Sequence, residues 1–497
     1  MKTTCLLTKS KFLEYVQCSE RLNKSLSQPG LIDEATKHVF LNGNEVGLLA
    51  RELFPTGIEV GEIRAPILYE DYLNSNLSKP GSAFFEALFR TKNLLARADI
   101  LSVLSDGSLK ISEVKSTTSF KEEEHLPDLY FQKRVIEEST GLKVSELELI
   151  HVNSEYVFDG TWALQEYFTV MKVSYQEEVQ AQIYKKIDKC LEHLQEGFPE
   201  FLPGQQCKKP YVCPHFHICN SKHDSILNLR RGGSKIGNYL NQGIKRISEV
   251  QDVSFLTPFQ LKQYESEKLG RPVIDYGQLR EFLNRITYPC SFLDFEGFST
   301  PIIHELGLIN IKPYSQIVFQ AELKVSSSKN DFNLLEHGII AIPGIDPRKQ
   351  IADFLNHYLP ETGSVVVYFK NYEVTRIREL IHLYPEYKNK FKSIIDRIVD
   401  LEEVFSRGIY VDGRFEGSTS IKKVLGIVCE DMAHAYEDLA LINNGQLANI
   451  KYLQYLQGFL PIEEKQLILN SLKKYCSLDV YSLWKIIKQL RRICEKA

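Results

Sequence analysis

The chain has 497 residues, 43% of them hydrophobic and 25% charged, a composition typical of globular proteins. A single hydrophobic core rarely serves so long a chain, so we expect two to four domains. The formal net charge of −4 gives no basic signal for the chain as a whole, so contacts with nucleic acid must come from local patches. Ten cysteines do not indicate a secreted disulfide scaffold in so large a chain, and no apolar run approaches the roughly 18 residues of a membrane span. We therefore expect a cytoplasmic protein.

A domain boundary is indicated by "SILNLRRGGSKIGNYLNQGIKRI", which is rich in Gly, Asn and basic residues. We predict a first domain at residues 1–225, a connector at 226–285 and a second domain at 286–497. Five basic residues of the connector either contact phosphates or keep it solvated: Arg230, Arg231, Lys235, Lys245 and Arg246.

The first candidate site lies in "ARADILSVLSDGSLKISEVKS", residues 96–116, which predicts two strands around "SDG". A three-residue hairpin loop places glycine in the left-handed conformation at its third position, and Gly107 fits. That register sets Asp99 opposite Glu113, with Lys115 on the same face. Two carboxylates can hold a divalent cation, and a lysine beside them can orient or help activate water at a phosphate. For this pattern alone, a solvent-facing hairpin edge with alternating charges is the alternative.

Helices are predicted on both sides of the hairpin. "GNEVGLLARELFPTG" carries Glu45 at its start, and "PDLYFQKRVIEESTG" carries Gln132. The order of helix, strand with Asp, strand with ExK and helix with Gln resembles the RecB-like branch of the PD-(D/E)XK nucleases. The resemblance implies a restriction-endonuclease-like fold in which Asp99 and Glu113 bind metal, Lys115 assists catalysis and Gln132 belongs to a supporting motif. Glu45 corresponds to the first motif, as a further metal ligand, where many relatives have histidine.

Three cysteines stand at six-residue steps in "GQQCKKPYVCPHFHICN": Cys207, Cys213 and Cys219. Zinc sites usually contain a C-x₂₋₄-C pair, which is missing here, so zinc completed by a histidine is the weaker interpretation. A fourth thiolate is offered by Cys18 in "LEYVQCSERLN". One cysteine before the nuclease core and three after it resembles the RecB-like nucleases related to the CRISPR-associated exonucleases. That resemblance implies a [4Fe–4S] cluster held by all four, which would join the two ends of the domain.

The second candidate site begins in "YPCSFLDFEGFST", where Asp294 and Glu296 interrupt a buried strand. Residues two apart on a strand share a face, so the two carboxylates repel each other unless a positive charge lies between them. "GSVVVYFKNYEVTRIREL" predicts a buried strand running into a helix with Glu373 in its first turn. "NSLKKYCSLDVYSLWKIIKQL" predicts an amphipathic helix with Tyr475 and Asp479 on one face.

This order of motifs resembles the tyrosine subgroup of the DEDD 3′–5′ exonucleases, which have the RNase H-like fold. The resemblance implies that Asp294, Glu296, Glu373 and Asp479 hold two divalent ions and that Tyr475 orients the attacking water. Asp400, in "DRIVDLEEVF", competes with Glu373 as the third acid. Magnesium or manganese suits an all-oxygen site.

The motif order of the second half, together with "FEGSTSIKKVL" and "YCSLD", also resembles an uncharacterised bacterial domain that is often fused behind RecB-like nucleases, so this resemblance covers both halves. The fold class expected is α/β in two domains. The leading hypothesis is a metal-dependent nuclease with two centres that acts as an exonuclease on nucleic acid, DNA more than RNA. The alternatives are a nucleic-acid-binding scaffold with one or both centres degenerate, and a zinc-stabilised regulatory protein.

Overall fold

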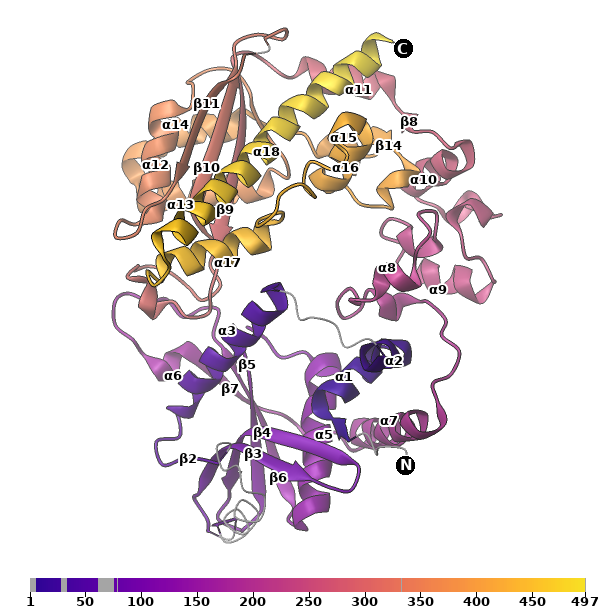
Figure 1. The fold of residues 1–497 in the computed structure, drawn as a ribbon, viewed down its shortest axis with the longest axis vertical. Coiled ribbons are helices and arrows are strands. Elements are labelled where there is room, and N and C mark those ends of the chain that lie inside the picture. Colours follow the sequence, from indigo (N-terminus) through magenta and orange to yellow (C-terminus); the bar gives the residue numbers. More distant parts are fainter. Residues whose placement is uncertain (1–5, 28–33, 61–75, 78, 332, 497) are drawn as a thin grey trace. The chain divides into compact units, whose positions relative to one another are not determined.

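The computed structural model describes residues 6–27, 34–60, 76–77, 79–331 and 333–496. The chain forms two compact units, both of mixed α/β structure (Figure 1). The first comprises Met1–Cys219 together with Thr300–Ser315, and the second comprises Asn220–Ser299 together with Gln316–Ala497. Among the described helices, none combines the length and the apolar character that crossing a bilayer requires.

The first unit is built on a seven-stranded sheet of order β2-β3-β4-β5-β6-β7, with β1 pairing with β4. The pairs β1–β4, β2–β3 and β5–β6 are parallel and the others are antiparallel. Apolar side chains alternate along β4, as expected for a strand packed against helices. The strands are β1 (Leu7–Thr8), β2 (Ile58–Glu59), β3 (Ala83–Arg90), β4 (Leu94–Val103), β5 (Leu109–Lys115), β6 (Val144–Val152) and β7 (Phe168–Lys172).

Helix α5 (Glu122–Thr140) forms the centre of the first unit and is buried along most of its length. Its buried side chains include polar ones such as Asp128 and Gln132, which need partners inside the unit because an unpaired buried polar group is costly. The helix packs between the sheet and helices α1 and α7, and Phe131 stacks on Phe12 of α1 with ring centroids 5.2 Å apart. The other helices are α1 (Lys9–Gln17), α2 (Ser19–Ser27), α3 (Glu34–Arg51), α6 (Leu164–Tyr167), α7 (Glu177–Glu196) and α8 (Phe216–Cys219), with a 3₁₀ turn at Gln205–Cys207.

A segment from the connection between β9 and β10 of the second unit belongs to the first unit. This segment, Thr300–Ser315, ties into the first unit through backbone and side-chain contacts. Tyr167 donates a hydrogen bond to the Pro301 carbonyl at 3.0 Å, Trp162 stacks on His304, and Tyr314 donates to the Ser116 carbonyl. The chain therefore crosses between the units three times.

The second unit contains a five-stranded sheet of order β11-β10-β9-β12-β13. β10 is antiparallel to both of its neighbours, whereas β12 is parallel to both β9 and β13. The strands are β9 (Cys290–Phe298), β10 (Ile317–Ser326), β11 (Leu335–Ile340), β12 (Val365–Val367) and β13 (Ile398–Asp400), and a separate pair is formed by β8 (Val273–Ile274) and β14 (Tyr410–Val411).

The two faces of β9 meet different helices. Leu293 and Phe295 pack with α12, α13 and α14, while α17 and α18 cover the opposite face, which carries Asp294 and Glu296 (Figure 1). The helices are α9 (Ser234–Asn241), α10 (Pro258–Leu269), α11 (Tyr276–Asn284), α12 (Pro347–Tyr358), α13 (Asn371–Leu383), α14 (Lys388–Asp396), α15 (Glu403–Ser406), α16 (Ile421–Val428), α17 (Gly445–Leu456) and α18 (Ile462–Glu495).

Residues 226–285, the expected connector, are folded within the second unit. They carry α9, α10 and α11 and form a small core of their own. This core contains Ile226, Leu229, Tyr239, Ile247 and Val250.

Candidate active sites

The hairpin of β4 and β5 has the geometry expected from the sequence. Gly107 has a φ of +79°, and Ile100 pairs with Ser112. The three-residue loop with a left-handed glycine is therefore confirmed, as is the register that sets Asp99 against Glu113. The register matters because a two-residue turn would have placed these two carboxylates on opposite faces of the sheet.

A charge-balanced cluster surrounds Glu113. The Lys115 amine donates to Glu113 and to Asp128, at 2.6 Å each. The Lys9 amine donates to Glu113 at 2.8 Å and lies 3.3 Å from a carboxylate oxygen of Asp128. The side-chain amide of Gln132 donates to the same two carboxylates, at 2.6 and 2.8 Å. Two lysines thus balance two buried carboxylates, and a buried glutamine holds the two carboxylates together.

Two members of this cluster, Lys9 and Asp128, had no place in the sequence-based site. Asp128 could have been found, because it stands four residues before Gln132 and so shares its helix face. Lys9 could not, because its position depends on the pairing of β1 with β4 and on Thr8, whose hydroxyl caps α1 by accepting from the Lys11 N–H. Long-range pairing of a two-residue strand leaves no local signal in the sequence.

Burial and the two lysines shift the pKa values of the cluster in opposite directions. Burial, followed by the charges of Asp128 and Asp99, raises the pKa of Glu113 to about 7. Burial also opposes ionisation of Asp128, but Lys115 and Lys9 outweigh it and hold the pKa of that carboxyl well below its usual range. The same carboxylates overcome the burial of Lys115 and raise the pKa of its amine. The cluster therefore favours one ionised carboxylate, Asp128, and keeps Glu113 near the point of titration.

A cleft of about 810 Å³ opens onto Asp99, Glu113 and Lys115. Helix α3 borders it through Asn44 and other residues, but Glu45 does not line it and is exposed. Helix α3 begins at Glu34, so Glu45 stands in the middle of the helix and not at its start. The assignment of Glu45 as a metal ligand stays a prediction that no contact of the described residues supports.

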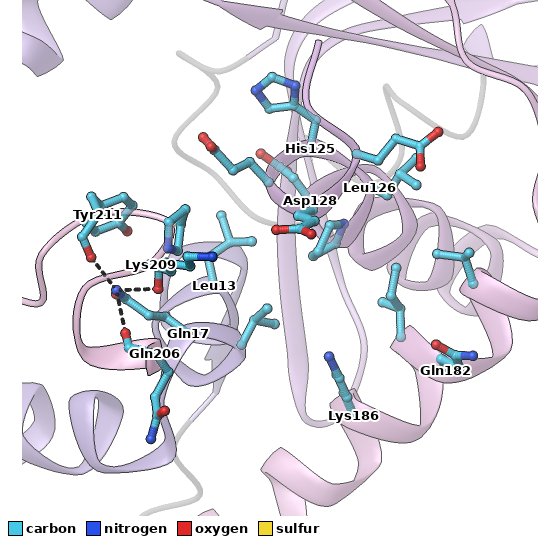
Figure 2. A pocket seen from close by; sticks show the side chains of 18 of the residues that line it. Leu13, Gln17, His125, Leu126, Asp128, Gln182, Lys186, Gln206, Lys209 and Tyr211 are labelled. Atoms are coloured by element: carbon cyan, nitrogen blue, oxygen red, sulfur yellow. Dashed lines mark hydrogen bonds between the residues drawn. The ribbon is translucent and has the colours of Figure 1, made fainter. Parts of the chain in front are cut away.

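A second cavity, of about 720 Å³, is lined in part by Lys115 and by Asp128, which Figure 2 labels. Figure 2 shows Gln17 of α1 beside the loop at 206–211, with Gln182 and Lys186 of α7 across the cavity. The Gln17 amide nitrogen donates to the carbonyls of three loop residues: Gln206 at 3.2 Å, Lys209 at 3.1 Å and Tyr211 at 2.8 Å. One buried side chain thus fixes the end of α1 to the loop that carries Cys207.

The four predicted cysteines converge. Cys18 follows Gln17 directly, and together with Cys207, Cys213 and Cys219 it lines one small pocket. All four are free thiols, and burial raises the pKa values of Cys18, Cys207 and Cys219. Among the described residues, no three of these sulfurs lie within 4.8 Å of one another. The structure brings the set together without the tight spacing that one shared ion would impose.

In the second unit, Asp294 and Glu296 lie on the face of β9 that α17 and α18 cover. Glu296 is only 8% exposed. In the β9–β10 register, Asp294 stands beside Glu322 and Glu296 beside Gln320, so a third carboxylate neighbours the pair. Gln320 is itself fixed by donating to the Leu472 carbonyl of α18 at 3.0 Å.

Glu373 and Asp400 have different surroundings. Glu373, in the first turn of α13, is buried, one of its carboxylate oxygens has no partner among the described residues, and the charge of Asp294 contributes to raising its pKa after burial. Asp400 accepts hydrogen bonds from the backbone N–H groups of Phe369 at 2.9 Å, Lys370 at 3.1 Å and Glu402 at 3.0 Å. Asp400 therefore shapes the turn between β12 and α13, whereas Glu373 has a carboxylate oxygen left over for a ligand.

Helix α18 brings Tyr475, Cys476 and Asp479 to the same place. Tyr436 donates a hydrogen bond to Asp479, and the hydroxyl of Tyr475 also bonds to Asp479. The thiol of Cys476 donates to Asp294 at 3.4 Å, and Asp294, Glu296 and Cys476 each offer an atom within 4.8 Å of the other two. The sequence did not indicate Cys476 or Tyr436 as members of this site, although Cys476 stands next to Tyr475.

One lysine faces this group of acids. The Lys422 amine lies over the rings of Tyr436 and Tyr475, 5.2 and 5.0 Å from their centroids, and donates to the Asn443 carbonyl. Burial lowers the pKa of Lys422, against the opposing effect of Asp479, Glu296 and Asp294. A single half-buried ammonium group does not neutralise four carboxylates.

The pKa values of the four acids record this imbalance. Burial, with the neighbouring carboxylates, raises the pKa values of Asp294, Glu296 and Glu373 well above their usual range. Burial raises the pKa of Asp479 to about 6, less than it otherwise would because two tyrosine hydroxyls and Lys422 favour its ionised form. Buried carboxylates that repel one another are the setting in which a divalent cation binds.

The basic residues near the boundary make contacts within the second unit. Arg230 donates to the Gly417 carbonyl at 3.1 Å and lies over the ring of Phe259, and Lys235 donates to the Phe255 carbonyl. Arg246 pairs with Glu249 at 2.8 Å. Arg231 and Lys245 are exposed. Three of the five therefore serve local structure.

Comparison with known proteins links parts of the chain to uncharacterised families. Residues 291–420 match a domain of unknown function, DUF2779. Uncharacterized protein MG366 of Mycoplasma genitalium is 30% identical over 227 residues, which are 43% of this chain and 33% of that protein. Uncharacterized protein UU173 of Ureaplasma parvum is 24% identical over 226 residues, 41% of this chain and 32% of that protein. The chain spans about a third of the length of the curated relatives it matches.

Two solved structures are distantly similar. The structure of SSO0001 aligns with 45% of this chain and 89% of its own at 14% identity, with a TM-score of 0.21. The alkaline exonuclease of Laribacter hongkongensis aligns with 38% of this chain and 88% of its own at 13% identity, with a TM-score of 0.18. The chain is thus a mixed α/β protein whose residues 291–420 match DUF2779.

Proposed function

We propose that the chain is a metal-dependent nuclease with two hydrolytic centres, one in each unit. The observation that carries the proposal is the convergence of Asp294, Glu296, Glu373 and Asp479 from three separate parts of the second unit, all with raised pKa values. Such a group is costly to bury without a cation. Its oxygen donors suit Mg²⁺ or Mn²⁺.

In the second unit, the four acids would hold the metal. Glu373 is a better candidate than Asp400 because one of its oxygens has no partner among the described residues and the charge of Asp294 acts on it. When bound, the ions would activate water and stabilise the leaving oxygen of a phosphodiester. Tyr475 keeps its proton, since burial and the neighbouring acids raise its pKa, so its hydroxyl orients water and does not act as a base. We infer trimming of 3′ ends from the resemblance to the DEDD exonucleases.

In the first unit, Asp99 and Glu113 would hold the metal in the cleft. Lys115 is held by two carboxylates and stays protonated, so it would stabilise charge at the phosphate and orient water. Gln132 would fix Glu113 through its amide, while its buried carbonyl oxygen has no partner among the described residues. These contacts support a RecB-like nuclease centre.

The four cysteines are proposed to hold a [4Fe–4S] cluster with a structural role. Four thiolates around one tetrahedral zinc would lie about 3.8 Å apart, given a Zn–S bond of about 2.3 Å. The wider spacing of these sulfurs favours a larger inorganic group, and no carboxylate is needed to complete the donor set. A brown protein that contains iron and inorganic sulfide would support the cluster. A protein that contains zinc and no iron would show instead that the four cysteines form a zinc site.

The test is cleavage of end-labelled single- and double-stranded DNA and RNA with Mg²⁺ or Mn²⁺. The wild type is compared with Asp99→Ala, Asp294→Asn and the double variant, and Asp188→Asn, an exposed site on α7, is the control. Each single variant should lose one activity and the double variant both. Full activity of the double variant would refute the two-centre proposal, and binding without cleavage by the wild type would favour a nucleic-acid-binding scaffold.

A further inference from the structure

The site on β9 contains a sulfur atom that an all-oxygen magnesium centre does not need. Cys476 is fully buried on α18, between the acids of β9 and the body of the helix. Its thiol is directed at Asp294, 3.4 Å from one carboxylate oxygen. A magnesium or manganese ion gains nothing from a thiol, because these ions prefer oxygen donors.

The geometry of this sulfur matches a different ion. In a tetrahedral zinc site, a Zn–S bond of about 2.3 Å and a Zn–O bond of about 2.0 Å place the sulfur and the oxygen about 3.5 Å apart. The 3.4 Å between Cys476 Sγ and Asp294 is close to that value, and Glu296 supplies a third atom within 4.8 Å of both. Three protein donors with one position left for water make a common zinc arrangement.

We propose that Asp294, Glu296 and Cys476 form an inhibitory site for Zn²⁺ and similar thiophilic divalent cations. This rests on the proposed function, since the site shares Asp294 and Glu296 with the proposed catalytic metal site. Zinc binding displaces the thiol proton of Cys476 to solvent, because a coordinated thiol is deprotonated by the ion. With Zn²⁺ bound by Cys476, Asp294 and Glu296 would be occupied as its ligands and would not be available to Mg²⁺.

Selectivity follows from the donors. Zinc binds a given mixed site more tightly than manganese in the general order of divalent metals, and a thiolate increases the difference. The surrounding carboxylates Glu373 and Asp479 favour any dication, so they do not distinguish the two ions. The sulfur of Cys476 alone makes the distinction, and one substitution can remove it.

The experiment compares the wild type with Cys476→Ser, which keeps a small polar group in the same place, and with Cys476→Ala. Cys429→Ser is the matched control, because Cys429 is also buried in the second unit but lies near Asp431 and not near the acids. Zinc and manganese are titrated separately by calorimetry, and bound zinc is counted after dialysis. The four cysteines of the first unit are present in every variant, so the difference between variants reports the second unit.

We expect Cys476→Ser and Cys476→Ala to retain one zinc equivalent fewer, or to bind it at least about tenfold more weakly, with Mn²⁺ affinity changed less than about threefold. Zinc should inhibit 3′ trimming by the wild type and by Cys429→Ser more strongly than trimming by Cys476→Ser. Cobalt should give a sulfur-to-metal absorption band whose amplitude falls by one equivalent in Cys476→Ser.

Equal zinc stoichiometry and affinity in the wild type and both Cys476 variants would overturn the inference. The measurements distinguish a failure of this inference from a failure of the proposed function. If Mn²⁺ neither binds nor supports cleavage while zinc binding still requires Cys476, the nuclease proposal fails and the zinc site stands. If Mn²⁺ supports trimming and zinc affinity is the same with and without Cys476, the zinc-site inference is wrong and the nuclease proposal stands.

Discussion

At the scale of single residues, Lys9 shows how a side chain far from a motif completes its chemistry. Lys9 and Lys115 together neutralise Glu113 and Asp128, which are almost fully buried. Removing one lysine leaves the two buried carboxylates with only one positive charge beside them. Such a loss weakens a fold more than the loss of an exposed ion pair does.

We predict that Lys9→Met lowers the free energy of unfolding by about 2 kcal/mol, less than a fully buried pair would cost, because Lys115 remains and Lys9 is partly exposed. The pKa of Glu113 should rise above its present value of about 7, which moves the acid limb of metal binding to higher pH. Urea denaturation and Mn²⁺ titration across pH measure the two effects. The double variant Lys9→Met, Asp128→Asn should recover part of the stability, and Lys189→Met, an exposed lysine of α7, should change neither.

The acids of the second unit predict a dependence of stability on pH. The pKa of Asp479 is about 6 in the folded protein, whereas the ordinary value, which applies to the unfolded chain, is 3.8. The folded state therefore binds the proton more tightly than the unfolded chain. The stabilisation from this group is complete below about pH 4 and is lost as the pH rises through about 6. A shift of this size corresponds to roughly 3 kcal/mol at most.

In EDTA, the wild type should thus lose more unfolding free energy than Asp479→Asn between pH 4 and pH 7, as measured by chemical denaturation. Mn²⁺ should remove this loss in the wild type, because the ion replaces the proton. If the two proteins have parallel pH profiles without metal, the acids of β9 and α18 do not interact as the structure indicates.

The side chains that the sequence indicated are positioned by residues nearby in the chain, and those that it did not indicate are positioned by residues far away in the chain. The sequence placed Asp99, Glu113 and Lys115 together because a hairpin register depends on a few neighbouring residues and one glycine. Tyr475 and Asp479 were found from helical spacing. Tyr436 was missed because it reaches Asp479 from a loop whose path depends on the fold of the whole unit. Asp400 and Glu373 could not be distinguished, since only the backbone of residues 369–370 shows what Asp400 binds.

At the scale of elements, this difference gives a test of the third acid. Glu373→Gln should reduce Mn²⁺ binding to the second unit and leave the metal-free protein at least as stable, because a buried carboxyl with a raised pKa is replaced by a neutral group. Asp400→Asn should weaken the three hydrogen bonds that Asp400 accepts from backbone N–H groups, and should therefore destabilise the protein by about 1–3 kcal/mol. Its effect on metal affinity should be smaller than that of Glu373→Gln. Calorimetry and thermal denaturation of both variants decide the assignment, and the opposite pattern would make Asp400 the ligand.

Helix α1 and the loop at 206–211 are held together by one amide, that of Gln17. Gln17→Ala leaves three loop carbonyls without this donor and should cost about 1–3 kcal/mol locally. We expect faster hydrogen exchange at the amides of Cys207 and Cys213 and faster loss of any bound iron. Gln182→Ala, an exposed residue across the same cavity, is the control and should change neither. Unchanged exchange in Gln17→Ala would mean that the cysteines hold the loop unaided.

The order of the main elements followed from the sequence better than the extent of the units did. Apolar runs located β9 and β12, and the apolar face of α18 located the last helix. Residues 226–285 were expected to be a connector, because Gly and basic residues indicate turns, yet short helices with a few apolar residues pack there into a small core. A core of five residues is too sparse to give a periodic pattern.

At the scale of the whole molecule, the segment at 300–315 makes a prediction about fragments. A fragment of residues 1–225 lacks the partners of Tyr167, Trp162 and Ser116. We expect it to unfold at lower urea concentration than the first unit does in the full chain, and to recover when a peptide of residues 299–316 is joined to its end by a flexible linker. A scrambled peptide is the control. Equal stability of the fragment and the full-length unit would show that the segment is dispensable.

The same segment also affects when the first unit can finish folding during synthesis. A ribosome releases the chain from its first residue onward, so the first unit has its sheet and central helix long before residues 300–315 exist. Its folding cannot be completed until β9, a strand of the other sheet, has already emerged. Domains that are each built from one continuous stretch of chain can fold one after another as they are synthesised, without this delay. Here the early part of the chain must remain unfinished while about a hundred further residues are made, and during that interval the surface around Trp162 and Tyr167 is open to chaperones and to mistaken pairing.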